Sequence, residues 1–430
     1  MTVAIVIILL FVFLATGMPI AFAMGISGVV GLYILGGSDL ALGVLQTTPY
    51  ENVAAFLFTT IPMFILMAEL MTASNMTKDL FYASHKWLSN LPGGLGIATI
   101  IAGAGLGALS GSSTASAATL ATSAVPEMEK YGYKTHFSMG VASISGTLAI
   151  MIPPSMVLIL YGILTETGVG DLLVAGVIPG IVTALGYILT VVYWVKRHPD
   201  VAPKIYEKTS LSEKVKSLKN IWAAVLLIII VIGGIYLGIV TATEAGALGA
   251  FGAFLIALSS RRLKFKAAQT AFQKTLKATG MIVTIVFCSM IFSYFLTATQ
   301  VTQNLINVVT DSGMSKWLVL AIVVVLYLIL GFFMDQVAIL ILTLPFTFPL
   351  MMSLGFNPIW FGIVVTKTAE IGLVTPPVGM NVFVAAGAAG VKTHEAFRGV
   401  TRFVICELII LLILILFPVI STWLPEMIMK

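Results

Sequence analysis

Apolar runs long enough to cross a lipid bilayer recur along the whole chain. Examples are VAIVIILLFVFLA (3–15), AAVLLIIIVIGGIYLGIV (223–240) and LVLAIVVVLYLILGFF (318–333). A helical span needs roughly 20 mostly apolar residues, and only helices and closed barrels satisfy their backbone groups in lipid. With 59% hydrophobic and 10% charged residues, the sequence predicts an all-α polytopic membrane protein. The first run lacks a basic flank and a small-residue cleavage site, so we expect a retained span and not a signal peptide.

Groups that could run enzymatic chemistry are sparse. Cys288 and Cys406 lie in apolar segments and the four histidines are scattered, which suggests neither a disulfide nor a metal centre. No GxSxG, HExxH, Walker or dinucleotide-binding motif occurs with the flanks that it requires. The net charge of +5 comes from residues between the apolar runs and does not indicate nucleic-acid binding. We therefore expect neither an enzyme nor an organic cofactor.

Basic residues cluster at 196–219, at 261–277 and at 392–402, whereas 300–315 contains no Lys or Arg. The positive-inside rule predicts that the three clusters are cytoplasmic. Counting crossings outward from them places both chain termini on the opposite, outer face. Segments 78–88 and 261–277 are basic and moderately amphipathic, so we expect interfacial helices at matching positions in the two halves.

An internal repeat appears when the chain is shifted by 223 residues, which aligns 111–177 with 334–400 without a gap. Pro126 then meets Pro349, and Pro153-Pro154 meets Pro376-Pro377. Transporters often contain such repeats in inverted orientation. We predict repeats at 1–200 and 221–430 around a basic cytoplasmic linker at 201–220. Each repeat has three spans, a re-entrant hairpin, a broken span and a final span: 2–16, 18–35, 53–73, 92–128, 135–165 and 172–196, then 221–240, 243–259, 279–299, 316–352, 358–390 and 403–424.

The predicted hairpins have polar tips. The first tip reads SGSST (110–114) and the second reads GFFMDQVAI (331–339). Irregular polar backbone at bilayer depth is tolerated only when it is buried in protein or lines a cavity. The alternatives are a helix-packing face of small residues for the first hairpin and an N-cap role for Asp335 in the second. An N-cap and a functional role for Asp335 are compatible.

The two Pro-Pro pairs lie inside the predicted broken spans. Proline removes a backbone donor and breaks a helix, and both spans are too long for one straight crossing. Unwound carbonyls with the hydroxyls of Ser145, Thr147, Thr368 and Thr375 would suit Na⁺, and helix N-termini would suit an anionic substrate. The alternative is a kink used only for packing. Lys367 and Glu370 are spaced to form a structural ion pair on one helix face; the alternative is that Lys367 attracts a carboxylate substrate. We expect packing or interfacial pairs for Glu69, Glu244 and Glu407.

Three segments carry a family resemblance: GLGALSGSSTASAATLATSAVPEMEKYGY, IMIPPSMVLILYGILTETGVGDLLVAGVIPG and EIGLVTPPVGMNVFVAAGAAG. They resemble the large membrane (M) subunit of tripartite ATP-independent periplasmic (TRAP) transporters, and the tips and Pro-Pro loops resemble the wider ion-transporter superfamily. The resemblance implies an elevator-type, Na⁺-coupled importer of organic acids, such as C4-dicarboxylates, keto acids or sialic acid, in a bacterial inner membrane. Both termini would then be periplasmic. The implied partners are a periplasmic substrate-binding (P) protein and a separate four-span (Q) membrane subunit, besides membrane lipid.

The resemblance also implies site residues, position by position. The first Na⁺ site would use Ser112, Ser113, Thr114, Ser145, Gly146, Thr147 and the carbonyl of Met151. The second would use Gly331, Met334, Asp335, Thr368, Gly372 and Thr375. Substrate would lie between the tips, near Ser113, Gln336, Pro154 and Pro377. The competing hypothesis is a channel or a proton-coupled carboxylate carrier in which Asp335, Glu244 and Glu370 relay protons.

Overall fold

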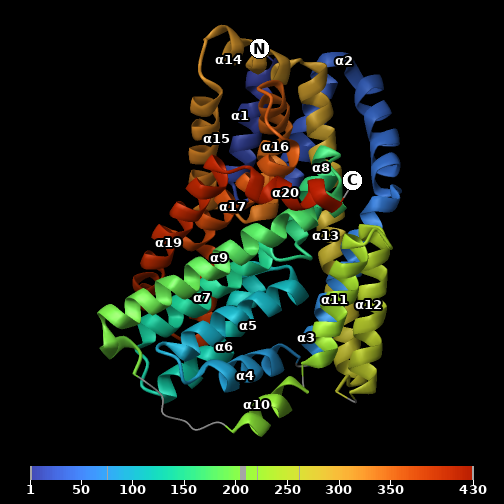
Figure 1. Cartoon of the computed structure of the whole chain (residues 1–430). Coiled ribbons are helices and arrows are strands. Elements are labelled where there is room, and N and C mark those ends of the chain that lie inside the picture. Colours follow the sequence, from blue (N-terminus) through green and yellow to red (C-terminus); the bar gives the residue numbers. More distant parts are fainter. Residues whose placement is uncertain (1, 75, 204–209, 220, 261, 429–430) are drawn as a thin grey trace.

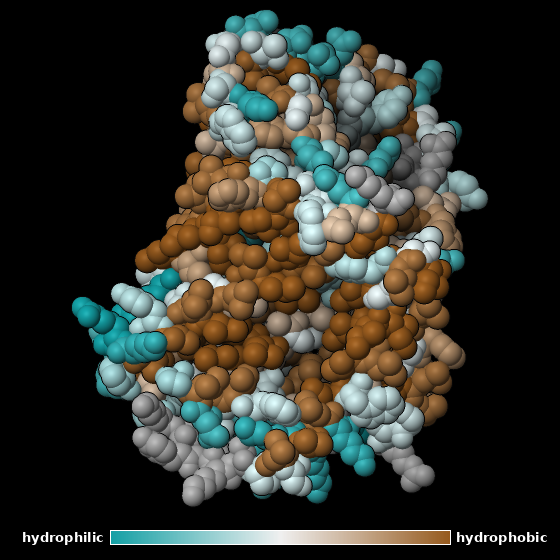
Figure 2. All heavy atoms as spheres, in the orientation of Figure 1, coloured by the Kyte–Doolittle hydropathy of each residue, from teal (hydrophilic) through white to brown (hydrophobic). Residues whose placement is uncertain are grey.

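The computed structural model describes residues 2–74, 76–203, 210–219, 221–260 and 262–428 (Figure 1). In this part of the chain the secondary structure is helical throughout, without a strand. Eight of the described helical segments are long and apolar enough to cross a membrane, when η1 with α3 and α7 with α8 are each counted as one segment. Figure 2 shows a broad apolar face between hydrophilic ends. The all-α polytopic prediction is therefore confirmed.

The first half of the chain contains three spanning or near-spanning helices followed by the hairpin and the broken helix. Its elements are α1 (Thr2–Ala15), α2 (Ile20–Val53), η1 (Phe56–Thr59), α3 (Thr60–Ala73), α4 (Met76–Leu88), α5 (Gly94–Ser110), α6 (Ser113–Lys130), α7 (Thr135–Met151), α8 (Met156–Thr165), α9 (Val169–Arg197), η2 (Pro199–Val201) and α10 (Leu211–Leu218).

The second half has the same order of elements. They are α11 (Trp222–Tyr236), α12 (Ala242–Ser259), α13 (Phe265–Ala298), α14 (Val301–Asp311), α15 (Lys316–Gly331), α16 (Gln336–Ser353), α17 (Pro358–Val374), α18 (Met380–Ala389), α19 (Thr393–Leu416) and α20 (Val419–Ile428). In Figure 1, α14 lies at the upper end of the molecule, and α4 and α10 lie at the lower end.

Helix boundaries follow the 223-residue shift most closely around the hairpins and Pro-Pro pairs. Both ends of α6 and α16 differ by 223 residues, and so do both ends of α7 and α17. The breaks predicted at the Pro-Pro pairs are present, between α7 and α8 and between α17 and α18. The inverted orientation of the halves, and the division at 201–220, stay predictions. Residues 204–209 and 220 of that linker lie outside the described residues, as does Arg261 of the second basic cluster.

Several predicted boundaries are wrong. The span predicted at 18–35 is part of a longer helix, α2, which continues to Val53. This helix is kinked at Gly36 and Gly37, and Gly37 has φ 69°. Consequently the span predicted at 53–73 begins only at Phe56. The span predicted at 221–240 ends at Tyr236, before Gly238, which has φ 64°. The span predicted at 403–424 begins earlier, at Thr393, and is interrupted after Leu416, because Pro418 cannot continue the backbone hydrogen bonding.

The predicted interfacial helices also need correction. Segment 261–277 is not a separate helix, because Phe265–Ala298 forms one continuous helix, α13. No proline interrupts it, so its basic first turns continue directly into the apolar part. Segment 78–88 does form a separate amphipathic helix, α4. The 223-residue shift carries α4 onto α14 rather than onto 261–277.

The helices pack mainly within two groups. One group joins α1, α2, α3, α11, α12 and α13, and the other joins α5, α6, α7, α9, α17, α18 and α19. Glycines allow the second group to approach backbone to backbone. A Cβ on Gly146 of α7 would lie 2.5 Å from the Ala117 nitrogen of α6, and one on Gly140 would lie 2.5 Å from the Gly399 carbonyl carbon of α19. This close packing holds α6 of the first hairpin against α7, and α7 against α19.

Candidate functional site

The first hairpin tip ends at the first Pro-Pro break. Gly111 takes a left-handed conformation (φ 59°) between α5 and α6, and a Cβ there would lie 2.8 Å from the Pro154 carbonyl oxygen. Ser112 caps α6, since its hydroxyl accepts from the Ala115 N–H at 3.4 Å. The serine-rich turn and the non-helical backbone of the broken helix therefore lie in contact.

Asn381 links this tip to the other half of the chain. The Thr114 hydroxyl donates to Asn381 Oδ1 at 2.7 Å, and the Ser113 hydroxyl donates to the same oxygen at 3.4 Å. Asn381 lies in α18, just after the second Pro-Pro pair, and is 0% exposed. Its Nδ2 has no hydrogen-bond partner among the described residues. The sequence prediction missed Asn381, although a lone amide in the apolar stretch MNVFVAAGAA was a usable signal.

The other predicted residues of the first site face two different neighbours: Ser145 and Gly146 face the hairpin, and Thr147 and the Met151 carbonyl face α9. A Cβ on Gly103 of α5 would lie 2.8 Å from the Ser145 Cβ, and Gly146 lies against α6, so both α7 residues face the hairpin. The Thr147 hydroxyl instead donates to the Ile144 carbonyl at 2.5 Å and lies 2.7 Å from the Tyr187 hydroxyl of α9. The Met151 carbonyl faces Gly176 of α9. Thr147 is thus directed away from the hydroxyls at the tip.

The second hairpin meets the second broken helix through glycine. A Cβ on Gly331, the last residue of α15, would lie 2.8 Å from the Gly372 Cα of α17. Asp335 is exposed and caps α16, since its carboxylate accepts from the Ala338 N–H at 3.1 Å. Met334 is half-buried. Gln336 is buried, and its Nε2 has no hydrogen-bond partner in the described part of the chain. The N-cap interpretation of Asp335 is confirmed.

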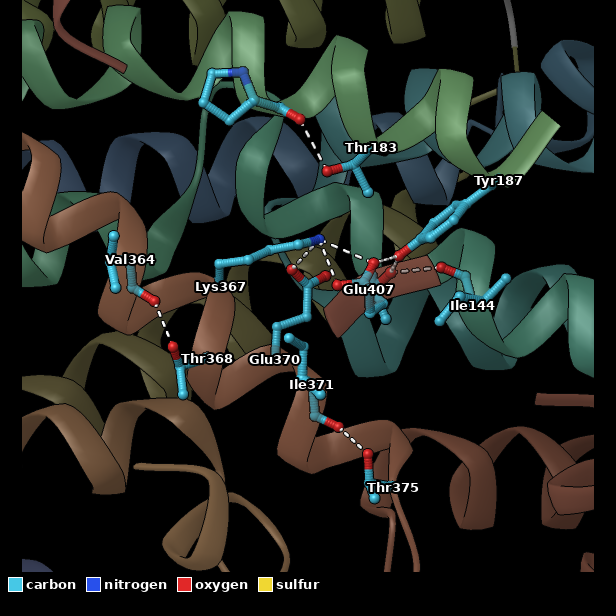
Figure 3. Close-up of polar contacts among 12 residues, drawn as sticks. Ile144, Thr183, Tyr187, Val364, Lys367, Thr368, Glu370, Ile371, Thr375 and Glu407 are labelled. Carbon is cyan, nitrogen blue, oxygen red and sulfur yellow. Dashed lines mark hydrogen bonds and ion pairs between the residues drawn. The ribbon is translucent and has the colours of Figure 1, made fainter. Parts of the chain in front are cut away.

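Hydroxyls beside the breaks donate to their own helices. Thr368 donates to the Val364 carbonyl at 2.7 Å and Thr375 to the Ile371 carbonyl at 2.6 Å (Figure 3). In α7, Ser145 donates to the Val141 carbonyl at 2.6 Å. A hydroxyl has one proton and two lone pairs, so these oxygens retain acceptor capacity. Hydroxyl and carbonyl oxygens of this kind are suitable ligands for a hard cation.

The two Pro-Pro segments differ in exposure. Both contain a cis peptide bond between the two prolines. Pro153, Pro154 and Ser155 are buried, whereas Pro376, Pro377 and Val378 are exposed. The predicted substrate-region residues Pro154 and Pro377 consequently have unlike surroundings. The same Pro-Pro break therefore occurs twice, and only the second copy is exposed at the protein surface.

A buried cluster of charges lies beside these segments (Figure 3). Lys367 Nζ lies 2.7 Å from Glu407 Oε2 and 3.4 Å from Glu370 Oε2, and all three side chains are 0% exposed. The Tyr187 hydroxyl donates to Glu407, and Thr147 contacts Tyr187. The predicted pairing of Lys367 with Glu370 is confirmed, but its closer partner is Glu407 of α19. Glu407 was detectable as a single acid within the apolar sequence VICELIILL.

The remaining acids that the sequence singled out have structural roles. Glu69 pairs with Lys274 at 3.5 Å. Glu244 accepts from the Thr241 backbone N–H at 2.8 Å, and the Thr241 hydroxyl accepts from the Glu244 N–H, which forms a capping box. Within the described residues, the hydrogen bonds and ion pairs of Glu370 involve the Lys367 cluster and not Asp335. The acids proposed for a proton relay therefore do not form one hydrogen-bonded chain.

Residues 7–420 match the family described as tripartite ATP-independent periplasmic transporter, DctM component. The chain belongs to this family. The C4-dicarboxylate TRAP transporter large permease protein DctM of Pseudomonas aeruginosa is 34% identical, over 94% of this chain and 94% of its own length. The sialic acid TRAP transporter large permease protein SiaM of Vibrio cholerae is 26% identical, over 96% of each chain. The crystal structure of the YdaH transporter of Alcanivorax borkumensis shares the fold, with a TM-score of 0.64 at 14% identity, covering 89% of this chain and 90% of that one.

Membership of the DctM family confirms the resemblance seen in the sequence. It identifies a multi-pass membrane permease rather than an enzyme. The residues described above are the polar groups of that permease at its hairpin tips, its helix breaks and its buried charge cluster.

Proposed function

We propose that this chain is the large membrane subunit of a Na⁺-driven importer of small organic acids. Its substrate would be of the C4-dicarboxylate, keto-acid or sialic-acid class. It would work in a bacterial inner membrane, with both termini periplasmic, together with a four-span membrane subunit and a periplasmic binding protein that delivers the substrate. The hairpins and broken helices would move as one body past the remaining helices, as in an elevator.

The observation that supports this proposal is the contact of each hairpin with a broken helix. At the first tip, Gly111 meets the Pro154 carbonyl, and at the second hairpin, Gly331 meets Gly372. Discontinuous helices in transporters offer unwound carbonyls to cations and helix N-termini to anions. The proposal therefore assigns one Na⁺ to each contact, as a transported ion.

The ligands proposed for Na⁺ are hydroxyl, carboxylate and backbone carbonyl oxygens that retain a lone pair. They are Ser112, Ser113, Thr114 and Ser145 with the Gly146 backbone at the first contact, and Thr368, Thr375, Asp335 and the backbone of Gly331, Met334 and Gly372 at the second. The substrate carboxylate is assigned to the space between the tips. Gln336 begins α16 beside the second tip and Asn381 contacts the first, and the amide nitrogens of both lack a partner among the described residues; we propose them as donors to carboxylate oxygens.

The test is uptake of radiolabelled dicarboxylate, keto acid or sialic acid into proteoliposomes that contain both membrane subunits, with the binding protein supplied outside. Uptake is expected with Na⁺ outside and not with K⁺ or choline. Unchanged uptake without Na⁺ refutes the coupling. Uptake driven by a pH gradient alone supports the proton-coupled alternative through Asp335 and Glu370 instead.

Single substitutions test the proposed ligands. Ser112→Ala and Thr375→Ala are each expected to raise the Na⁺ concentration for half-maximal uptake about tenfold, which corresponds to about 1.4 kcal/mol. Thr401→Ala is the matched control for Thr375→Ala, because Thr401 also donates to its own helix, at 2.9 Å to the Phe397 carbonyl, but is exposed on α19. An unaltered Na⁺ response in both test variants removes these ligand assignments.

A further inference from the structure

An apolar groove of about 840 Å³ lies between α9 and α19, away from the hairpin tips. Its walls include Leu185, Leu189, Ile405 and Ile409, which are 54% to 68% exposed. In Figure 1 these two helices run side by side toward the lower left of the molecule, and Figure 2 shows an apolar face over them. Side chains so apolar and so exposed, in a membrane protein, form a surface suited to an acyl chain.

One end of the groove is cationic. Arg197, His198 and Arg402 line it there, and the Arg402 guanidinium lies 4.3 Å from the centre of the Trp194 ring. A smaller hollow of about 230 Å³ shares Trp194, His198 and Arg402 with the groove. That hollow adds Lys134, His136, Asp200 and Arg398 to its lining. The apolar groove thus opens directly into a basic cluster.

Among the described residues, basic side chains outnumber carboxylates at this end of the groove. Among the described residues, Arg197, Arg398 and Arg402 have no carboxylate within ion-pair distance. The nearby Asp200 is paired with Lys134, whose hydrogen bond and charge lower the pKa of Asp200. Glu395 lies 3.3 Å from the His394 ring nitrogen. Within the described part of the chain, three guanidinium groups are therefore available to an external anion.

We propose that this groove binds an anionic phospholipid, with the phosphate between Arg197 and Arg402 and an acyl chain along Leu189 and Ile409. Guanidinium groups bind phosphate oxygens in a two-pronged geometry. Basic pockets between transmembrane helices on the cytoplasmic side are suited to anionic headgroups, and the positive-inside rule predicts that this end is cytoplasmic. The charge favours a lipid over a helix of another subunit, because an apolar helix offers no anion to the arginines.

The first experiment is native mass spectrometry of the purified full-length chain after equilibration with mixed micelles of phosphatidylglycerol or phosphatidylcholine. Phosphatidylglycerol is expected to be retained in preference to phosphatidylcholine. Arg197→Gln and Arg402→Gln are each expected to weaken that retention about fivefold, because one basic residue near an anionic lipid surface contributes about 1 kcal/mol. Leu189→Trp fills the apolar wall and is expected to reduce retention while leaving the arginines in place.

Lys316→Gln is the matched control. Lys316 also carries its charge over aromatic rings, 5.7 Å from the centre of Trp317 and 5.4 Å from that of Phe356, but it lies at the start of α15, near α14 at the other end of the molecule. This variant is expected to retain phosphatidylglycerol as the wild type does. Glycerol phosphate, which has the headgroup without chains, is expected not to displace the bound lipid.

Three results would overturn the proposal. They are equal retention of the two lipids, displacement by glycerol phosphate alone, and retention unchanged in both arginine variants. A cysteine at Leu189 that crosslinks to the small membrane subunit in the assembled complex would assign the groove to that subunit instead. None of these readouts depends on Na⁺, so the lipid site and the proposed coupling can fail separately.

Discussion

Replacing Lys367 with methionine tests the energetics of the buried charge cluster. The ammonium group lies 2.7 Å from one Glu407 oxygen and 3.4 Å from one Glu370 oxygen, and the three side chains have no exposed surface. Lys367→Met leaves two carboxylates buried without a cation. Removing one partner of a buried ion pair costs about 3–5 kcal/mol, and methionine fills most of the lysine volume, so little packing is lost.

Neutralising one of the two carboxylates, instead of removing the ammonium group, should be tolerated. The cluster has two carboxylates for one ammonium group, and Glu370 Oε1 has no hydrogen-bond partner among the described residues. Glu370→Gln removes one of the two acidic groups and keeps the shape of the side chain. We therefore expect its free energy of unfolding to change by less than about 1 kcal/mol, within the range of a neutral hydrogen bond. The double variant Lys367→Met with Glu407→Gln should recover part of the loss, because it leaves one buried carboxylate instead of two.

The assay is denaturant unfolding in mixed micelles, followed by tryptophan fluorescence. Trp360 is a suitable reporter, because it is 1% exposed in α17 and its indole N–H donates to the Leu414 carbonyl of α19 at 2.8 Å. The expected order of stability is wild type and Glu370→Gln first, then the double variant, then Lys367→Met. A Lys367→Met protein as stable as the wild type refutes the reasoning, as does a Glu370→Gln protein that loses as much as Lys367→Met.

Three further outcomes are expected. Asn381→Asp keeps the oxygen that accepts from Ser113 and Thr114, but it loses the amide donor and adds a negative charge. It should lower the apparent affinity of uptake for the organic acid at least tenfold. Asn307→Asp is the control, because Asn307 is exposed on α14, and it should leave that affinity unchanged. Gly331→Ala should abolish uptake, since its Cβ would lie 2.8 Å from the Gly372 Cα. Gly280→Ala, with no atom within 4 Å of its Cβ, should leave uptake intact and add up to about 1 kcal/mol of helix stability, as measured by unfolding midpoint. In binding assays, the arginine variants at the α9–α19 groove should bind phosphatidylglycerol about fivefold more weakly.

The broken helices were predictable because proline acts on its own backbone. Pro153-Pro154 and Pro376-Pro377 lack the backbone N–H groups that a helix needs, whatever surrounds them. Both helices are broken at these positions. The pairing of Lys367 with Glu370 was also local, at a spacing of three residues. Features that depend on one residue type or on helical spacing can therefore be obtained from sequence alone.

The contacts that shape the site were not predictable in this way. Asn381 lies 267 residues from Thr114, and Glu407 lies 40 residues from Lys367. Sequence periodicity says nothing about which helix faces which. The direction of Thr147, toward Tyr187 and not toward the tip, depends on the rotation of α7 within the bundle. The continuity of α13 was missed because a change from basic to apolar composition resembled a boundary, although the helix backbone needs no such boundary.

The unequal exposure of the two Pro-Pro segments has a chemical consequence. Ser155 is 0% exposed and Val378 is 41% exposed, although each follows its proline pair directly. A water-soluble maleimide would therefore modify a cysteine at 378 and spare one at 155 in the conformation described. If the elevator-type cycle proposed above operates on inverted repeats, we expect the reactivity of these two positions to exchange during the cycle. The maleimide reactivity of the two cysteine variants would then report which conformation the protein occupies, without any knowledge of the substrate.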